Sequence, residues 1–169
     1  MNLKGKPQAA YKFLVIALLL FPPVAYADNL KQRALRGLGG VEVLVETIDL
    51  EAGRLGLTEA QIQTDVELRL RKAGVRVLTE KESQETPGEP YLYVMINAFV
   101  DQTPTSVGFS IRVELMEQVT LARGFKARAA IWRTGAAGTV GTGNIRKIRE
   151  SVGDLVDKFI NDYLAANPK

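Results

Sequence analysis

The residue types most often used in catalysis are missing from this sequence. It contains no histidine and no cysteine, which removes the commonest general base, the thiolate nucleophile and the ligands of most zinc and copper sites. Carboxylates remain, such as Asp49 with Glu51 and Glu114 with Glu117, but their spacing does not hold two carboxylates at one reaction centre. We therefore expect no enzymatic activity, no metal ion and no cofactor.

A glycine-rich segment, 135–144 (GAAGTVGTGN), precedes the last predicted helix. As a loop it would expose backbone N–H groups at a helix N-terminus, where an anion can bind. It lacks the P-loop spacing and the dinucleotide fingerprint, so a flexible connection is the other interpretation. This segment is the basis of an alternative function in anion or carbohydrate processing. Its candidate anion-binding residues are Gly141, Gly143, Asn144, Arg146 and Lys147.

The segment 91–100 (YLYVMINAFV) is apolar at both alternating sets of positions. If the even-numbered set joins the core, the aromatic odd-numbered set stands on the outer face of a sheet, beside arginines of neighbouring strands. Aromatic residues mixed with arginine are typical of protein-interaction surfaces. The alternative is a central strand whose second face is covered by the leading segment or by loops. The candidate partner-binding residues are Tyr91, Tyr93, Met95, Phe99, Arg112 and Trp132.

Two amphipathic helices are expected to cover that sheet. The first is predicted to begin at Thr58, with Gln61 at the capping-box spacing. Gly74 follows it at the position of a left-handed C-terminal cap. The second, over 144–166, has apolar residues at intervals of three and four, and Pro168 follows it. A short helix over 29–38 precedes both.

Period-two patterns and β-branched residues predict about five strands. The segments 50–57 and 80–90 between them contain glycine or proline and are predicted as loops, the second one mobile. Helices and strands in this order predict an α+β two-layer sandwich, with a mostly antiparallel or mixed sheet and both helices on one face. The predicted strands are 41–49, 75–79, 91–100, 109–121 and 125–134.

The last two strands predict a hairpin in detail. A three-residue loop over 122–124, with glycine in the left-handed position, sets Leu121 opposite Phe125 and keeps the apolar side chains on one face. Continuing this register sets Val119 opposite Ala127 and Leu115 opposite Ile131, which leaves Trp132 on the outer face. Because the first strand is long, the hairpin either projects beyond the helices or is bent by a bulge.

The first 27 residues have the three parts of a secretory signal. A leader with Lys4, Lys6 and Lys12 comes before an apolar run over 13–21, and Ala25-Tyr26-Ala27 offers a cleavage site. The apolar run is too short to span a bilayer. We expect residues 1–27 to be a signal peptide, residues 28–169 to be one exported domain, and the mature chain to have no integral membrane segment.

Removing this signal changes the charge of the chain. The sequence has 22 Lys+Arg and 19 Asp+Glu, and because three lysines lie in the leader, residues 28–169 carry 19 of each sign. A formally neutral domain has no bulk field to attract a polyanion. We expect no nucleic-acid partner, and the composition says nothing about the oligomeric state.

The stretches VEVLVETIDL, TEAQIQTDVELRLRKAGVRVL and YLYVMINAFV resemble small α+β domains of Gram-negative envelope proteins. Examples are the N-terminal domain of TolB, the related domain of penicillin-binding-protein activator lipoproteins, and the lipopolysaccharide-assembly protein LptE. The resemblance covers 41–164 and lies in element order and patterning, so no family residue roles carry over; the chain also lacks the acylatable cysteine of the lipoprotein members. It implies a periplasmic accessory that binds an envelope protein or a glycolipid.

Overall fold

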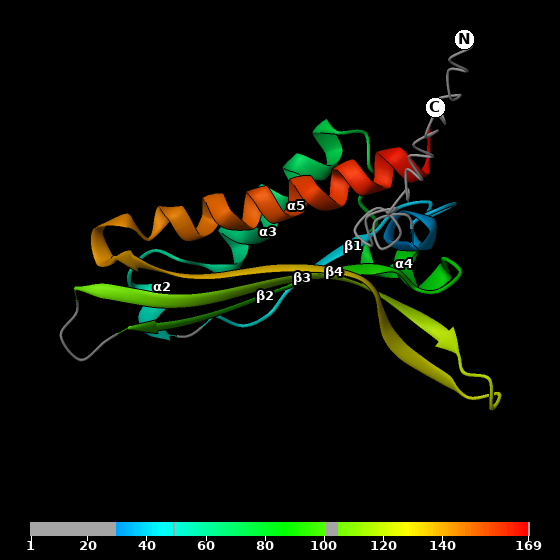
Figure 1. Ribbon diagram of the computed structural model, residues 1–169, viewed down its shortest axis with the longest axis horizontal. Coiled ribbons are helices and arrows are strands. Elements are labelled where there is room, and N and C mark those ends of the chain that lie inside the picture. Colours follow the sequence, from blue (N-terminus) through cyan, green and yellow to red (C-terminus); the bar gives the residue numbers. More distant parts are fainter. Residues whose placement is uncertain (1–29, 49, 101–104, 169) are drawn as a thin grey trace, which may run out of the picture.

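A computed structural model describes residues 30–48, 50–100 and 105–168. A four-stranded sheet lies under two long helices, so the fold is α+β, as the sequence predicted (Figure 1). The predicted signal, 1–27, lies outside the described residues. The strands are β1 (Glu42–Val45), β2 (Tyr91–Val100), β3 (Ser106–Thr120) and β4 (Lys126–Gly141), and the two long helices are α3 (Glu59–Lys72) and α5 (Arg146–Ala166).

The sheet is mixed and open, with the strand order β1-β2-β3-β4. β1 pairs in parallel with β2, whereas β2, β3 and β4 pair antiparallel in sequence. The prediction of a fifth strand over 75–79 is wrong, because this segment forms only an isolated bridge from Val77 to Val41. The Val41 amide bonds to Arg76 O at 3.0 Å and the Leu78 amide to Val41 O at 2.8 Å, and the chain then turns away into a helix.

Both long helices begin and end near the predicted residues. The Thr58 side chain accepts a 3.4 Å hydrogen bond from the Gln61 amide at the start of α3, and Gly74 follows its end with a φ of +80°. α5 follows a short 3₁₀ turn, Thr142–Asn144. The two helices bury their apolar stripes against the sheet and each other, and the buried residues of both helices form one core cluster with Leu92, Val94, Ile96 and Ala98 of β2.

Each of the two segments predicted as loops contains a short helix, which corrects that prediction. These helices are α2 (Leu50–Arg54) and α4 (Glu80–Glu85). A capping box begins α4: Thr79 accepts a bond from the Glu82 amide at 3.3 Å, and the Glu82 carboxylate accepts one from the Thr79 amide at 2.9 Å. This amide bond, with Arg76 beside it, lowers the pKa of Glu82 to about 2. The threonine and glutamate spacing that specifies this start is visible in the sequence.

The hairpin between β3 and β4 has the predicted tip. Gly124 has a φ of +84°, the Leu121 amide bonds to Phe125 O at 2.8 Å, and Val119 pairs with Ala127. Farther along, a bulge between Leu115 and Met116 shifts the register by one residue. The hairpin both bends and projects beyond the helical layer (Figure 1), so the two predicted explanations of its length hold together.

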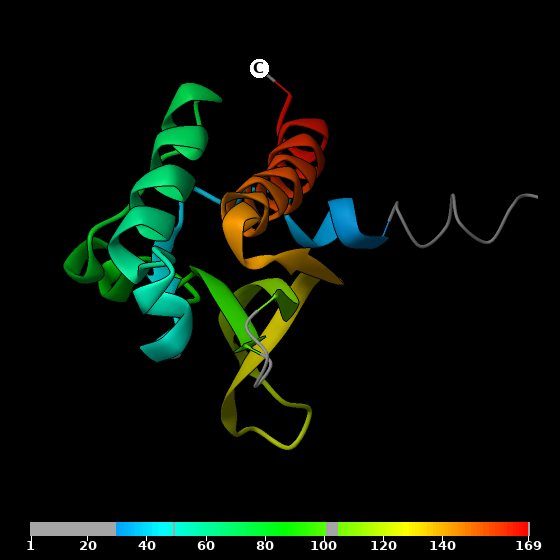
Figure 2. The same cartoon turned by 90° about the vertical axis from the view of Figure 1, so that its left-hand side faces the viewer.

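The helical layer is confined to one side of the sheet. Seen along the strands, α3 and α5 lie side by side above it, while the hairpin hangs below (Figure 2). No helix in the described ranges is long and apolar enough to cross a membrane.

Candidate functional site

The face of the sheet opposite α3 and α5, here called the outer face, carries the candidate site. Among the described residues no helix lies across this face (Figures 1 and 2). Phe99 is 71% exposed and Leu44 is 43% exposed on this face, whereas Tyr91, Tyr93 and Met95 are half-buried. Large apolar groups left in water on an otherwise well-packed domain are the first place to look for a binding surface.

Five of the six candidate partner-binding residues lie together on this face. Leu92, Val94, Ile96 and Ala98 of β2 are buried in the core, and because strand side chains alternate, the odd-numbered ones point outward. Arg112 pairs with Met95 on the neighbouring strand, and its guanidinium donates a 2.7 Å hydrogen bond to the Met95 sulfur. The residues brought together are Tyr91, Tyr93, Met95, Phe99 and Arg112.

One row of side chains crosses all four strands. Tyr93 is the register partner of Leu44 on β1 and of Glu114 on β3, and Glu114 pairs in turn with Arg133 on β4. An apolar residue, a tyrosine, an acid and a base therefore stand in line across the outer face. Directly opposed residues in a sheet interact, so this row presents a mixed surface with charge toward β4.

Phe99 owes its exposure to its neighbours. Its partner on β3 is Gly108, which pairs with Thr139 on β4. A glycine offers no side chain for the phenyl ring to pack against, so the ring remains in solvent. A large apolar group held out in this way is suited to insertion into a partner.

The hydroxyl of Tyr93 is a fixed hydrogen-bond donor. Partial burial raises its pKa above the usual value, and a hydrogen bond that it donates to Glu46, together with the charge of that carboxylate, raises it further. The phenol therefore stays protonated at neutral pH. It holds the Glu46 carboxylate at the β1 side of the outer face.

At the hairpin end of the outer face, Tyr91 of β2 lies beside Arg128 of β4 and the turn that contains Glu89. The Arg128 guanidinium stands over its ring, 5.4 Å from the centroid, in the geometry of a cation–π contact. Arg128 also bonds to the Glu89 carbonyl at 2.9 Å and to the Glu89 carboxylate. A hollow of about 270 Å³ adjoins this group, and Leu44 and Tyr91 are among its lining residues.

Trp132, the sixth candidate, is not on this face, and its predicted placement is wrong. The bulge pairs Leu115 with Trp132 rather than with Ile131, which turns the indole inward, where it is only 2% exposed. The same shift turns Arg133 outward in its place. Trp132 therefore contributes to the core and cannot contact a partner directly.

The glycine-rich segment is not a loop, which corrects the second candidate site. Residues 135–141 continue β4, each paired with β3, and Gly141 pairs with Ser106. Gly143 and Asn144 form the 3₁₀ turn. Of the basic residues, Arg146 bonds to Glu150 at 3.1 Å and Lys147 is exposed. The predicted loop of exposed backbone N–H groups is therefore not formed in this described stretch.

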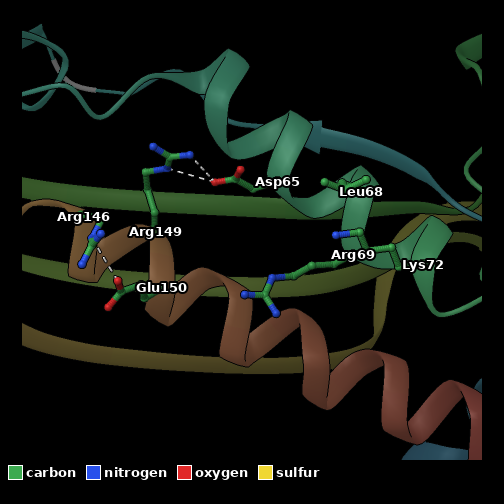
Figure 3. Close-up of a pocket in the computed structure, with 7 residues that line it drawn as sticks. All are labelled: Asp65, Leu68, Arg69, Lys72, Arg146, Arg149 and Glu150. Carbon is green, nitrogen blue, oxygen red and sulfur yellow. Dashed lines mark hydrogen bonds and ion pairs between the residues drawn. The ribbon is translucent and has the colours of Figure 1, made fainter.

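A cleft of about 490 Å³ between α3 and α5 gathers four basic side chains (Figure 3). Ion pairs neutralise three of them. Arg149 reaches across to Asp65 at 2.7 Å, Arg146 bonds along its own helix to Glu150 (Figure 3), and Arg69 bonds to Asp157 at 2.7 Å. Two of these pairs join one helix to the other, so the cleft serves to hold the helices together and gives an anion little net charge.

In the described ranges no group of three or more acidic residues could hold a metal ion. Comparison with protein-family models gave no match, and no curated protein matches the chain significantly. Evidence on function therefore comes from the geometry of the outer face.

Sequence reasoning missed part of this face. It did not foresee that Leu44 and Glu46 line up beside Tyr93, although the alternation in 41–49 places both on the side away from the buried valines. It also missed Arg133, because the bulge that turns this residue outward leaves no mark in the local pattern.

Proposed function

We propose that this protein is an exported, non-enzymatic accessory of the Gram-negative cell envelope that binds a partner protein through its outer face. The observation that carries the proposal is the open aromatic face itself, with Phe99 71% exposed and with Tyr91, Tyr93 and Met95 in line on the same strand. Export to the periplasm is supported by the lysine-containing leader, apolar run and cleavage site of residues 1–27. The missing histidine and cysteine favour binding over catalysis.

Charges of both signs favour a protein over a glycolipid. Glu46 lies toward the β1 side of the face, while Arg112 and Arg133 lie toward the β4 side. A phosphorylated glycolipid would favour a surface of one positive sign. Protein interfaces combine an aromatic centre with a mixed polar rim, and this is the composition of the outer face.

Two variants test the proposal without disturbing the fold. Phe99→Ala and Arg112→Ala both alter exposed side chains on the outer face, and loss of a central aromatic or arginine anchor commonly weakens an interface by about 2 kcal/mol or more. The matched control is Phe125→Ala, because Phe125 is 69% exposed but lies at the hairpin. The tagged protein would be crosslinked in the cell envelope and its bound molecules identified.

We expect one envelope protein to be recovered with the wild type and with Phe125→Ala, and to be lost with Phe99→Ala and with Arg112→Ala. Equal recovery with all four proteins would contradict the proposal. Recovery of a glycolipid instead of a protein would retain the surface but overturn the choice of partner.

A further inference from the structure

The free edge of β4 is a second surface, separate from the outer face. Within the described ranges β4 is the last strand of the sheet and pairs only with β3, so one side of its backbone has no neighbouring strand among these residues. β4 runs for 16 residues, which is long for an edge strand. Such an edge presents a row of unpaired N–H and C=O groups to solvent.

The hydrogen-bond pattern identifies the backbone groups that face this edge. The Gln118 amide bonds to Gly88 O at 2.7 Å, away from β4, so even-numbered residues of β3 face β2 and odd-numbered ones face β4. Ala136 pairs with the odd-numbered Ile111 and therefore exchanges bonds with β3. The alternate residues Gly135, Ala137, Thr139 and Gly141 direct their backbone groups outward, where no described residue bonds to them.

This half of β4 lacks the features that usually protect an edge. Native sheets block edge pairing with charged side chains, proline or bulges. The hairpin half of the strand has Lys126, Arg128 and the bulge. Residues 134–141 contain no charge and no proline, and 135–139 are exposed. The unprotected stretch therefore lies in the half of β4 that is farther from the hairpin tip.

Charge selects the kind of strand that can bind there. β4 contains no acidic residue. Its bases are Lys126, Arg128 and Arg133, and Arg133 lies two residues before the open stretch. A second copy of β4 would bring further positive charge and no compensating acid, whereas an acidic strand would be attracted to the positive charge of β4.

We propose that the edge of β4 from Gly135 to Gly141 binds an extended, acidic peptide segment of a partner by strand addition. Main-chain bonds to the four outward residues supply the affinity, and the positive charge of β4 selects acidic over basic sequences. The segment extends the sheet by one strand. Arg133 adjoins both this edge and the outer face, but the outward backbone groups of β4 do not involve Phe99, so separate variants test the two.

A synthetic peptide of alternating valine and glutamate, about eight residues long to match the open stretch, is the probe. Its binding to the full domain would be followed by amide hydrogen exchange. The outward amides of Ala137 and Thr139 should become protected on binding, while those of Ala136 and Gly138, already bonded to β3, should change little. A valine and lysine peptide of the same length should not bind.

Ala137→Pro removes one outward donor and no bond to β3, a substitution that edge strands tolerate. It should weaken peptide binding at least about tenfold, while Ala137→Val, which keeps the amide, should bind as the wild type does. Phe99→Ala should also bind the peptide normally, which separates this site from the outer face.

Protection of Ala136 and Ala137 alike, equal binding of the lysine peptide, or unchanged binding by a folded Ala137→Pro variant would each overturn the proposal. Concentration-dependent self-association that Ala137→Pro abolishes would also overturn it, in favour of a second copy at this edge.

Discussion

The indole Nε1 of Trp132 on β4 donates a 2.8 Å hydrogen bond to the carboxylate of Asp162 on α5. The indole also meets the ring of Phe159 edge-on, with centroids 5.2 Å apart and planes at 72°. Because the bulge turns Trp132 inward, the longest helix is anchored to the edge strand by both a polar and an aromatic contact. This anchor holds α5 against one side of the sheet. Trp132 is therefore not available on the outer face.

Truncating this anchor should destabilise the protein rather than weaken partner binding alone. Trp132→Ala removes a buried aromatic side chain, which typically lowers the free energy of unfolding by about 3–5 kcal/mol. Trp132→Phe keeps an aromatic ring but loses the bond to Asp162, and should cost about 1 kcal/mol from that bond, with a further loss of packing. Urea denaturation measures both. The neighbouring Arg133→Ala should stay within about 0.5 kcal/mol of the wild type; an unchanged midpoint for Trp132→Ala would contradict the inward placement.

Gly135 should not tolerate a side chain. A Cβ at this position would lie 2.7 Å from the backbone oxygen of Ile111, and a backbone atom of the paired strand cannot move aside without breaking the ladder. Gly135→Ala should therefore lower the free energy of unfolding by about 1–3 kcal/mol, as overpacking does. Gly108→Ala is the matched control, because a Cβ there meets nothing within 4 Å. Thermal unfolding of both variants makes the comparison, and equal midpoints would show that β4 approaches β3 less closely.

Glu117 should make stability depend on pH. Burial raises the pKa of its carboxyl above the usual value, so the folded protein binds that proton more tightly than the unfolded chain does. Stability therefore decreases as pH rises through the interval between the unfolded and the folded pKa. Glu117→Gln should be more stable than the wild type at pH 7, and the difference should shrink as pH falls through that interval and be lost below about 4.

Denaturation of wild type and Glu117→Gln at several pH values tests this account. Glu85→Gln, an exposed change on α4, should alter stability little at neutral pH. A destabilised Glu117→Gln at pH 7 would mean that the carboxylate has a favourable partner in the folded state.

Local sequence signals were sufficient for some elements of this fold. The apolar repeats of α3 and α5 and the tip at Gly124 could be predicted because short-range spacing determines them. The helix at Glu80 could have been found by the same reasoning, since Thr79 and Glu82 have the spacing of its capping box. Pro87 and Gly88 follow this helix and end it, but they do not prevent it from forming.

Other features depend on contacts between distant residues. The glycine-rich stretch 135–141 is a strand because β3 extends alongside it from Ser106, and nothing in its own composition favours a strand over a loop. The bulge beside Leu115 depends on how the hairpin bends away from the helices. That single register shift exchanged Trp132 for Arg133 on the outer face. The candidate residues of β2 and β3 therefore lie on the face predicted for them, whereas Trp132 of β4 does not.

The central claim is that the outer face, rather than the helical face, meets the partner. A photo-crosslinking amino acid placed at Phe99, and separately at Leu68 on α3, tests it directly in the intact cell envelope. Both side chains are well exposed, at 71% and 47%, so either position can report contact. We predict a discrete crosslinked partner from position 99 and none from position 68. A partner captured from position 68 but not from position 99 would contradict the account.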